Sequence, residues 1–299
     1  MTPVPFDDRD GVIWLDGAYV PWREARLHVL SHGLHYASAV FEGERAYAGR
    51  IFKLREHTDR LIGSARILGF DLPFDVATID AACEGVLAAN GLSEAYVRPI
   101  AWRGSEQLSV AGNNTKVHLS IACWAWPNVF GADRMRGLRM TLAEWRRPDP
   151  ATAPVRSKAS GLYMIGTLAR NAAETAGYDD ALMLDWRGRV AEATGANVFF
   201  VIDGALHTPD PDCFLDGITR RTVMALARRL QMQVVQRAIM PEELGRASEA
   251  FIVGTAAEVT AVRSIGAHAY TPGRVTETLL GEFQRLVRLA PEEVARLAA

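Results

Sequence analysis

The sequence predicts two mixed α/β domains joined by a short linker. The chain of 299 residues is long enough for two domains of ordinary size, and 49% hydrophobic with 23% charged residues is a globular composition. Strand patterns and amphipathic helix patterns alternate in both halves, and turn residues gather near the middle. We therefore predict a small N-terminal α/β domain over 1–126, a linker over 127–136, and a larger C-terminal domain over 137–299 with helices and mixed or antiparallel sheets.

The first half begins with an antiparallel hairpin, because Asp16-Gly17 lies between two apolar runs in the segment 11–20. Apolar periodicity predicts the rest of this half: helices over 58–68 and 75–90, and strands over 95–102 and 117–126. In the first of these strands, the period of two places Tyr96 and Arg98 on one face. This pair is either a grip for an anion or the polar face of an edge strand, where Pro99 would be tolerated.

The second half is organised around Lys158. A strand over 137–145 and the proline-containing segment 147–154 lead to this lysine. A helix follows over 162–177, because apolar residues recur at helical spacing and a glycine ends the pattern. A lysine near the start of a helix is usually a solvent-exposed residue, so any chemical role must come from its partners. The remaining predicted elements are strands over 179–185, 190–202 and 249–253, and helices over 219–230, 241–246 and from 276 onward.

Histidines and cysteines do not follow a metal-binding pattern. His28, His32 and His35 are close in sequence, but no carboxylate or cysteine has the matching spacing. We interpret them as histidines held in local hydrogen bonds. The three cysteines are widely spaced and form no CxxC pair, which argues against a disulfide framework or a zinc site and is typical of a reducing cytosol.

The overall charge and hydropathy favour a small-molecule ligand. A net charge of -2 and a pI near 6.4 give no electrostatic reason to expect nucleic acid or an anionic membrane surface. No apolar run approaches the ~20 residues needed to cross a bilayer, and the first residues do not resemble a signal peptide. We therefore predict a cytoplasmic protein without a membrane, nucleic-acid or metal partner.

Two loops are suited to an anion. Gly217 and Thr219 begin a helix, where free backbone N–H groups and the helix dipole favour phosphate, and the small residues of 254–257 allow close approach to the backbone. Each loop alone is also an ordinary helix start or turn. P-loop, GxSxG, GxGxxG and HExxH patterns are absent. Together with Lys158 and the carboxylate of Glu192, the loops match what pyridoxal phosphate requires: a lysine for the Schiff base, an acid for the pyridinium nitrogen and donors for the 5′-phosphate.

A resemblance to a known family is carried by five segments in one order: 31–43 followed by Arg45 and Tyr47, then 96–98, 158–163, 192–197 and 254–258. They resemble the class IV, fold-type IV aminotransferases, and the likeness is strongest to branched-chain amino-acid aminotransferases. The resemblance extends over nearly the whole chain. It implies a two-domain, fold-type IV enzyme that uses pyridoxal 5′-phosphate.

The resemblance also implies roles for individual residues. Lys158 would be the catalytic residue that forms the Schiff base, Glu192 would pair with the pyridinium nitrogen, and Tyr163 would hydrogen-bond the ring oxygen. Arg55 resembles the phosphate-binding arginine of the family. The other cofactor-binding residues that it implies are Gly195, Ala196, Asn197, Gly217, Ile218, Thr219, Gly254 and Thr255.

On the substrate side, the resemblance implies a pocket that is completed by a second subunit, and hence a homodimer or a higher homo-oligomer. Its residues would be Tyr36, Phe41, Gly43, Tyr96, Arg98, Trp126, Val129, Ala256 and Ala257. The segment Pro127-Asn128-Val129 departs from the family, where one branch carries an aromatic residue. The size and polarity of the side-chain pocket therefore stay open.

The implied activity is a two-stage transamination by Schiff-base chemistry between leucine, isoleucine or valine and 2-oxoglutarate. Arg98 would bind the second carboxylate of glutamate, while an apolar wall accepts the branched side chains. Other activities within the superfamily stay open, namely D-amino-acid or (R)-amine aminotransferase and aminodeoxychorismate lyase. A non-catalytic module that binds pyridoxal phosphate is the alternative from a different class.

Overall fold

The structure is a computed structural model that describes residues 4–126 and 133–297. The chain forms two compact units, one of Met1–Pro127 with Ser157–Gly161 and the other of Asn128–Arg156 with Leu162–Ala299. Most of the predicted linker, residues 127–132, lies outside the described residues.

The segment Ser157–Gly161 differs from the prediction, because it joins the N-terminal unit although the sequence around it belongs to the C-terminal one. Ala159 forms an antiparallel bridge with Val40, and the Phe41 N–H donates to the Lys158 carbonyl oxygen at 3.1 Å. The patterns along the sequence could not reveal this return of the chain, because a single bridging segment has no periodicity.

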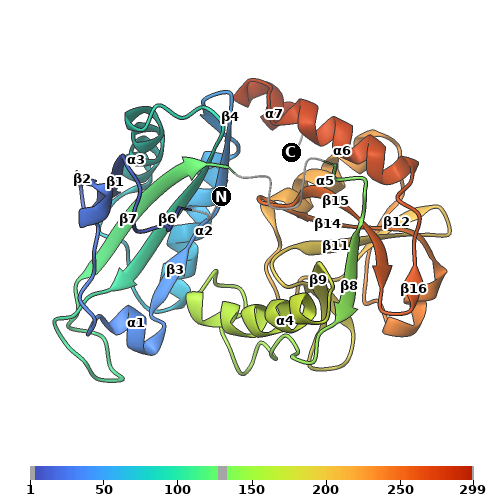
Figure 1. Ribbon diagram of the computed structural model, residues 1–299, viewed down its shortest axis with the longest axis horizontal. Coiled ribbons are helices and arrows are strands. Elements are labelled where there is room, and N and C mark those ends of the chain that lie inside the picture. Colours follow the sequence, from blue (N-terminus) through green and yellow to red (C-terminus); the bar gives the residue numbers. More distant parts are fainter. Residues whose placement is uncertain (1–3, 127–132, 298–299) are drawn as a thin grey trace. The chain divides into compact units, whose positions relative to one another are not determined.

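The N-terminal unit is a seven-stranded antiparallel sheet in the order β2-β1-β7-β6-β4-β5, with β3 also paired to β6. The strands are β1 Val12–Leu15, β2 Ala18–Pro21, β3 Ala39–Phe41, β4 Glu44–Tyr47, β5 Arg50–Ile51, β6 Ala95–Arg103 and β7 Val117–Ala125; the helices are η1 Trp22–Glu24, α1 His32–Tyr36, α2 Leu54–Ile67 and α3 Val76–Ala89. Both long helices cover one face of the sheet (Figure 1), where Leu61 and Ile79 are buried in one core with Trp14 and Ile121.

Several predictions for this unit are confirmed. The hairpin of β1 and β2 turns at Asp16 and Gly17, whose positive φ angles of 48° and 99° suit a tight turn. Helix α3 occupies the predicted range, whereas α2 begins at Leu54, four residues earlier than the predicted start. Strand β6 pairs with β7 on one side and with β3 and β4 on the other, so the edge-strand interpretation of Tyr96 and Arg98 is wrong.

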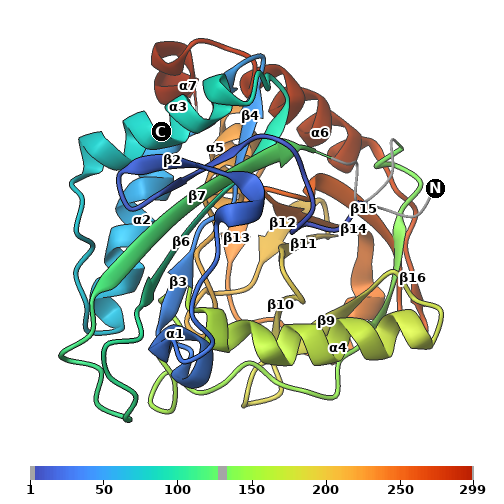
Figure 2. The ribbon, with the colours of Figure 1, turned by 60° about the vertical axis from the view of Figure 1, so that its left-hand side comes forward.

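The C-terminal unit is built on a nine-stranded mixed sheet in the order β10-β9-β8-β15-β14-β11-β12-β13, with β16 paired to β15. Its strands are β8 Leu138–Leu142, β9 Asp180–Leu184, β10 Val190–Ala193, β11 Asn197–Ile202, β12 Ala205–Thr208, β13 Val234–Gln236, β14 Ala247–Gly254, β15 Glu258–Ile265 and β16 His268–Ala269. Its helices are η2 Ser160–Tyr163, α4 Met164–Thr175, α5 Ile218–Arg229, η3 Pro241–Arg246, α6 Arg274–Leu286 and α7 Pro291–Leu297. Figure 2 shows α4 lying along β9, and α5 and α6 pack against β14.

Two helix predictions for this half need correction. The single helix expected from 276 is two helices, and Pro291 begins the second because proline suits the first turn of a helix but not its interior. Lys158 is not at the start of a helix: it lies in the bridge to β3, and α4 begins at Met164 after the turn η2. Among the described residues, no helix has the length and apolar character to cross a membrane.

Candidate active site

The backbone of Lys158 is held from two sides within the N-terminal unit. Its N–H donates to the Ser64 hydroxyl at 3.0 Å, and the neighbouring Ser157 hydroxyl donates to the Ser64 carbonyl oxygen at 2.9 Å. On the other side, its carbonyl oxygen accepts the Phe41 N–H. The Lys158 Nζ lies 4.8 Å from the centre of the Phe41 ring. Helix α2 and strand β3 therefore position the amine beside an aromatic face.

Five of the predicted substrate residues lie together around this face. The Arg98 guanidinium carbon is 4.7 Å from the centre of the Phe41 ring, and Arg98 Nη2 donates to the Tyr96 hydroxyl at 3.2 Å. The rings of Tyr96 and Trp126 stack with centroids 4.7 Å apart. A Cβ on Gly43 would lie 1.9 Å from the Tyr96 hydroxyl oxygen, so only glycine fits there. The predicted pairing of Tyr96 with Arg98 on one face is thus confirmed, and it places a cation and a hydroxyl beside aromatic walls.

Tyr36 is not part of this cluster. Tyr36 belongs to the short helix α1, is 44% exposed, and its ring lies 4.8 Å from the imidazole of His32. Val129 lies outside the described residues. Two of the three histidines make the expected local hydrogen bonds: His28 Nδ1 accepts the Leu30 N–H at 3.1 Å, and His35 Nε2 contacts the Val29 carbonyl oxygen at 2.9 Å. His32 differs, because its Nε2 contacts the carbonyl oxygen of Ser109, a residue distant in sequence, at 2.9 Å.

Two of the arginines of helix α2, Arg55 and Arg60, lie on different faces. The Arg55 side chain is 63% exposed and pairs with Asp59 at 3.1 Å, so its guanidinium stays accessible to a ligand. The Arg60 side chain is only 18% exposed and shares a helix face with Ser64, four residues along, which binds the backbone of Lys158. Sequence reasoning missed Arg60, although the helical period places it next to the buried face of α2.

A buried carboxylate holds Arg60. The Glu42 side chain is fully buried, and it accepts bonds from Arg60 Nε at 2.6 Å, from Arg60 Nη2 at 2.8 Å and from His57 Nδ1 at 2.8 Å. Burial by itself raises the pKa of Glu42, but the Arg60 charge and the hydrogen bonds from Arg60 and His57 outweigh it and hold that pKa well below its usual range. Burial lowers the pKa of His57, so this imidazole is neutral near pH 7. Arg60 therefore forms an ion pair with Glu42, on the helix face that also contacts the backbone of Lys158.

In the C-terminal unit, Asn197 connects the predicted cofactor residues. Its Nδ2 atom lies 3.3 Å from Glu192 Oε2 and donates to the Leu215 carbonyl oxygen at 3.1 Å. The other oxygen of Glu192, Oε1, lies 3.4 Å from Arg147 Nε. Asn197 also pairs with Val253 across β11 and β14. The carboxylate of Glu192 therefore accepts a hydrogen bond from an amide and lies within ion-pair distance of a guanidinium whose Nε has no hydrogen-bond partner among the described residues.

Both loops suited to an anion border Asn197. Gly217 precedes helix α5 as its N-cap, and a Cβ on this residue would lie 2.2 Å from Asn197 Oδ1. Among the described residues, no side chain caps the start of α5. Gly254 ends β14, and its Cβ position lies 3.6 Å from Ala196. The structure thus brings Asn197 and Gly217 together beside Glu192, and it places Gly254 against Ala196 and Gly195. Ile218 and Thr219 follow Gly217 in α5, and Thr255 follows Gly254 in the turn after β14.

The other predicted residues of this unit lie in two turns. Tyr163 is the N-cap of α4, and its carbonyl oxygen accepts the Thr167 hydroxyl at 3.2 Å. Ala256 and Ala257 belong to the turn between β14 and β15. The carbonyl oxygen of Ala257 accepts a bond from Arg134 Nη1 at 2.8 Å, which fixes the turn.

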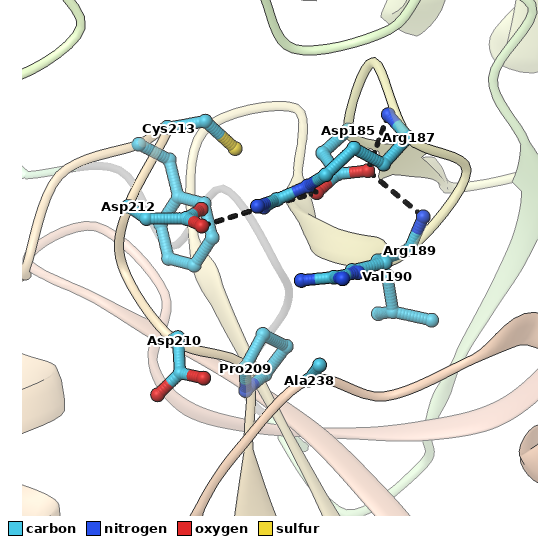
Figure 3. A pocket seen from close by; sticks show the side chains of 10 residues that line it. Asp185, Arg187, Arg189, Val190, Pro209, Asp210, Asp212, Cys213 and Ala238 are labelled. Atoms are coloured by element: carbon cyan, nitrogen blue, oxygen red, sulfur yellow. Dashed lines mark hydrogen bonds and ion pairs between the residues drawn. The ribbon is translucent and has the colours of Figure 1, made fainter. Parts of the chain in front are cut away.

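A separate cluster of Asp185, Asp212 and Cys213 has the spacing of possible metal ligands, with their ligand atoms within 4.8 Å of one another. Arg187 Nη2 lies between the two carboxylates, at 2.6 Å from Asp185 and 2.5 Å from Asp212 (Figure 3). Burial raises the pKa of the Cys213 thiol to about 12, so it stays protonated. Arg187 pairs with both carboxylates, although its single charge balances only one of them, and the backbone N–H groups of Arg187 and Arg189 also donate to Asp185. This cluster forms an ion-pair network of the C-terminal unit.

Comparisons with known proteins agree over the whole chain. The family model described as "Amino-transferase class IV" matches residues 39–265. The branched-chain-amino-acid aminotransferase of Pseudomonas aeruginosa is 40% identical over 288 residues, which is 94% of both chains. A crystal structure of the branched-chain aminotransferase of Thermoproteus uzoniensis with norvaline has a TM-score of 0.91 and 35% identity, covering 97% of this chain and 98% of that one.

A second solved structure is similar to the same degree. The T.th. branched-chain amino acid aminotransferase, complexed with N-(5′-phosphopyridoxyl)-L-glutamate, has a TM-score of 0.91 and 36% identity, again covering 97% of this chain and 98% of that one. These likenesses confirm the two-domain, fold-type IV architecture predicted from the sequence. The chain belongs to the class IV aminotransferases and is a transaminase.

Proposed function

We propose that this chain is a pyridoxal-phosphate-dependent aminotransferase that moves the amino group between leucine, isoleucine or valine and 2-oxoglutarate. The observation that carries the proposal is the fixed position of Lys158 beside Phe41 and Arg98, an amine next to an apolar wall and a cation. Several proteins that this chain resembles are named branched-chain aminotransferases, and one of them was solved with a phosphopyridoxyl derivative of glutamate.

The donor groups of the chain fit pyridoxal phosphate. The uncapped start of α5 and the Gly254-Thr255 turn offer backbone N–H and hydroxyl donors to a phosphate, and the tight approach at Gly217 requires a residue without a side chain. We assign the phosphate to these donors, including Thr219, and to Arg55, whose guanidinium is exposed. When bound, pyridoxal phosphate supplies the electron sink that stabilises negative charge at the substrate Cα.

The other predicted catalytic, cofactor-binding and substrate-binding residues would have separate roles. Lys158 would hold the cofactor through its amine and, once freed, move a proton between the substrate Cα and the cofactor's C4′ atom. Glu192 would accept the N–H of the ring nitrogen, which favours the protonated ring. Tyr163 would donate to the ring oxygen. Arg98 would bind the second carboxylate of glutamate, because a guanidinium matches a carboxylate in geometry and charge.

The proposal includes a homodimer or larger homo-oligomer. Leu27, Val29, Leu34 and Val110, all in the N-terminal unit, are exposed by 52% to 83%. Exposed large apolar side chains are suited to a contact with another protein, and a second copy of this chain is the partner that the resemblance implies. A cytoplasmic location stays a prediction from the three cysteines, all of which are free and buried.

Amino transfer from defined donors tests the proposal. Purified protein would be incubated with 2-oxoglutarate and L-leucine, D-alanine or an (R)-amine, and the glutamate formed would be quantified and its chirality measured. We expect L-glutamate from L-leucine and little from the other two donors. Lys158→Ala should abolish the transfer, because the amine that moves the Cα proton is removed. Turnover near that of the unaltered protein in this variant would refute the role of Lys158, while D-glutamate or dependence on the (R)-amine would select one of the alternative activities.

A further inference from the structure

Arg147 is a buried arginine with a fixed backbone. It is 7% exposed, its N–H donates to the Leu184 carbonyl oxygen at 2.8 Å, and it forms a parallel bridge with Asp185. Arg147 begins the proline-containing segment 147–154, which precedes Lys158 in the chain. Arg146, the preceding residue, is exposed, and its guanidinium donates to the Trp186 carbonyl oxygen at 3.5 Å.

The guanidinium of Arg147 faces Glu192. Arg147 Nε lies 3.4 Å from Glu192 Oε1, with the two side chains 8% and 12% exposed, and Glu192 is the only ion-pair partner of Arg147 within the described ranges 4–126 and 133–297. Arg147 Nη1 also donates to the Leu162 carbonyl oxygen at 3.4 Å, just before Tyr163. The other oxygen of Glu192 is held by Asn197.

The positive charge of Arg147 stabilises the ionised form of Glu192. A carboxylate with so little access to water is unstable as an anion unless a positive charge lies nearby. If the anion were lost, the protonated carboxyl would donate a hydrogen bond to an unprotonated ring nitrogen. The neutral carboxyl would also lack the negative charge that favours a protonated ring nitrogen, and the ring would be a weaker electron sink.

We propose that Arg147 is a positioning residue that holds Glu192 as an oriented carboxylate, so that Glu192 recognises the protonated ring nitrogen of pyridoxal phosphate. The inference rests on the proposed contact between Glu192 and that nitrogen. It assigns to Arg147 a role in cofactor recognition that does not require contact with the cofactor.

Cofactor binding tests this role without any measurement of turnover. Dissociation constants would be measured by absorbance titration for pyridoxal phosphate and for its analogue in which a CH group replaces the ring nitrogen. In Arg147→Met, the preference for pyridoxal phosphate over the analogue should fall about tenfold, the change that corresponds to one pKa unit of charge interaction. Arg146→Met is the matched control, and it should keep the preference of the unaltered protein.

The outcomes separate the inference from the proposed function. An unchanged preference in Arg147→Met overturns the inference in either of two forms: if binding of both ligands weakens equally, Arg147 only stabilises the fold, and if neither affinity changes, Arg147 does not act on Glu192. Glu192→Gln tests the underlying contact, because an unchanged preference in that variant would refute the pairing of Glu192 with the ring nitrogen. Should Arg147→Met not fold, Arg147→Gln provides the same test, since glutamine keeps a polar amide donor but carries no charge.

Discussion

Glu44, in β4, is a carboxyl group buried beside other acidic groups. It is 1% exposed. Burial, together with the nearby Glu42 and Asp80 carboxylates, raises the pKa of Glu44 well above its ordinary value, and the Arg60 charge only partly opposes this. The folded protein therefore retains a proton on Glu44 at pH values where the unfolded chain has already released it.

This proton makes stability depend on pH. Above the ordinary carboxyl pKa and up to the raised pKa of Glu44, the unfolded state binds fewer protons than the folded state, so the free energy of unfolding falls as pH rises. Glu44→Gln cannot release a proton, and we expect its stability relative to the unaltered protein to increase between pH 5 and pH 8, by about 1.4 kcal/mol for each unit by which the pKa is raised. Urea unfolding at both pH values measures this difference. Parallel pH profiles for the two proteins would show that Glu44 is ionised in the fold.

At the level of single residues, motif chemistry predicted Lys158 and Glu192, and the structure places each beside groups that suit its proposed role. The motifs in the sequence did not predict the ion pairs of Arg60 and Arg147. Their sequence neighbours are also arginines or other charged residues, and only the fold decides which of them is buried against a carboxylate. A single sequence carries no direct record of such contacts between distant segments.

At the level of elements, two arginines of helix α2 differ in how deeply their side chains are buried. Arg60 lies on the face that contacts the backbone of Lys158, while Arg55 lies on an exposed face. Replacing Arg55 with methionine should weaken binding of pyridoxal phosphate about 10- to 100-fold, the range for loss of a charged hydrogen bond. Binding of pyridoxal, which lacks the phosphate, should change little. Absorbance titration of each variant with both ligands measures the two affinities.

Arg66→Met is the control for this comparison, because Arg66 is an exposed arginine of the same helix that also pairs with an aspartate. Both affinities should stay near those of the unaltered protein. A double variant, Arg60→Met with Glu42→Gln, removes the buried pair without leaving either charge alone. If this double variant selectively weakened binding of pyridoxal phosphate and Arg55→Met did not, Arg60 would be the arginine that binds the phosphate. The assignment to Arg55 would then be abandoned.

The elements with strong periodicity or turn chemistry could be predicted, and the irregular ones could not. Helix α3 agrees with its predicted range because Asp75 and Asn90 flank it as caps. The five-residue helix α1 is too short to show a period, and it ends at Ala37 with a positive φ of 54°. The turn η2 and the bridge at Ala159 depend on contacts with distant parts of the chain.

At the level of the whole molecule, the exposed apolar residues of the N-terminal unit predict self-association. Leu34 is 64% exposed, and Leu34→Asp would place a charge in the proposed contact, where its desolvation is unfavourable. We expect this variant to dissociate to monomers at concentrations where the unaltered protein is a dimer or larger, as measured by sedimentation. Leu230→Asp, at an exposed apolar position of the C-terminal unit, should leave the assembly intact. A monomeric unaltered protein would contradict the proposed oligomer.

The segment Ser157–Gly161 has a consequence for how the chain acquires its fold during synthesis. The N-terminal unit contains this segment, which is made about thirty residues after the rest of that unit. Until residue 161 has left the ribosome, Val40 lacks its bridge to Ala159, and Phe41 and Ser64 lack their hydrogen bonds to the backbone of Lys158. The first unit to be translated therefore cannot be completed until part of the second has been made, and the lysine proposed for catalysis belongs to the segment that completes it.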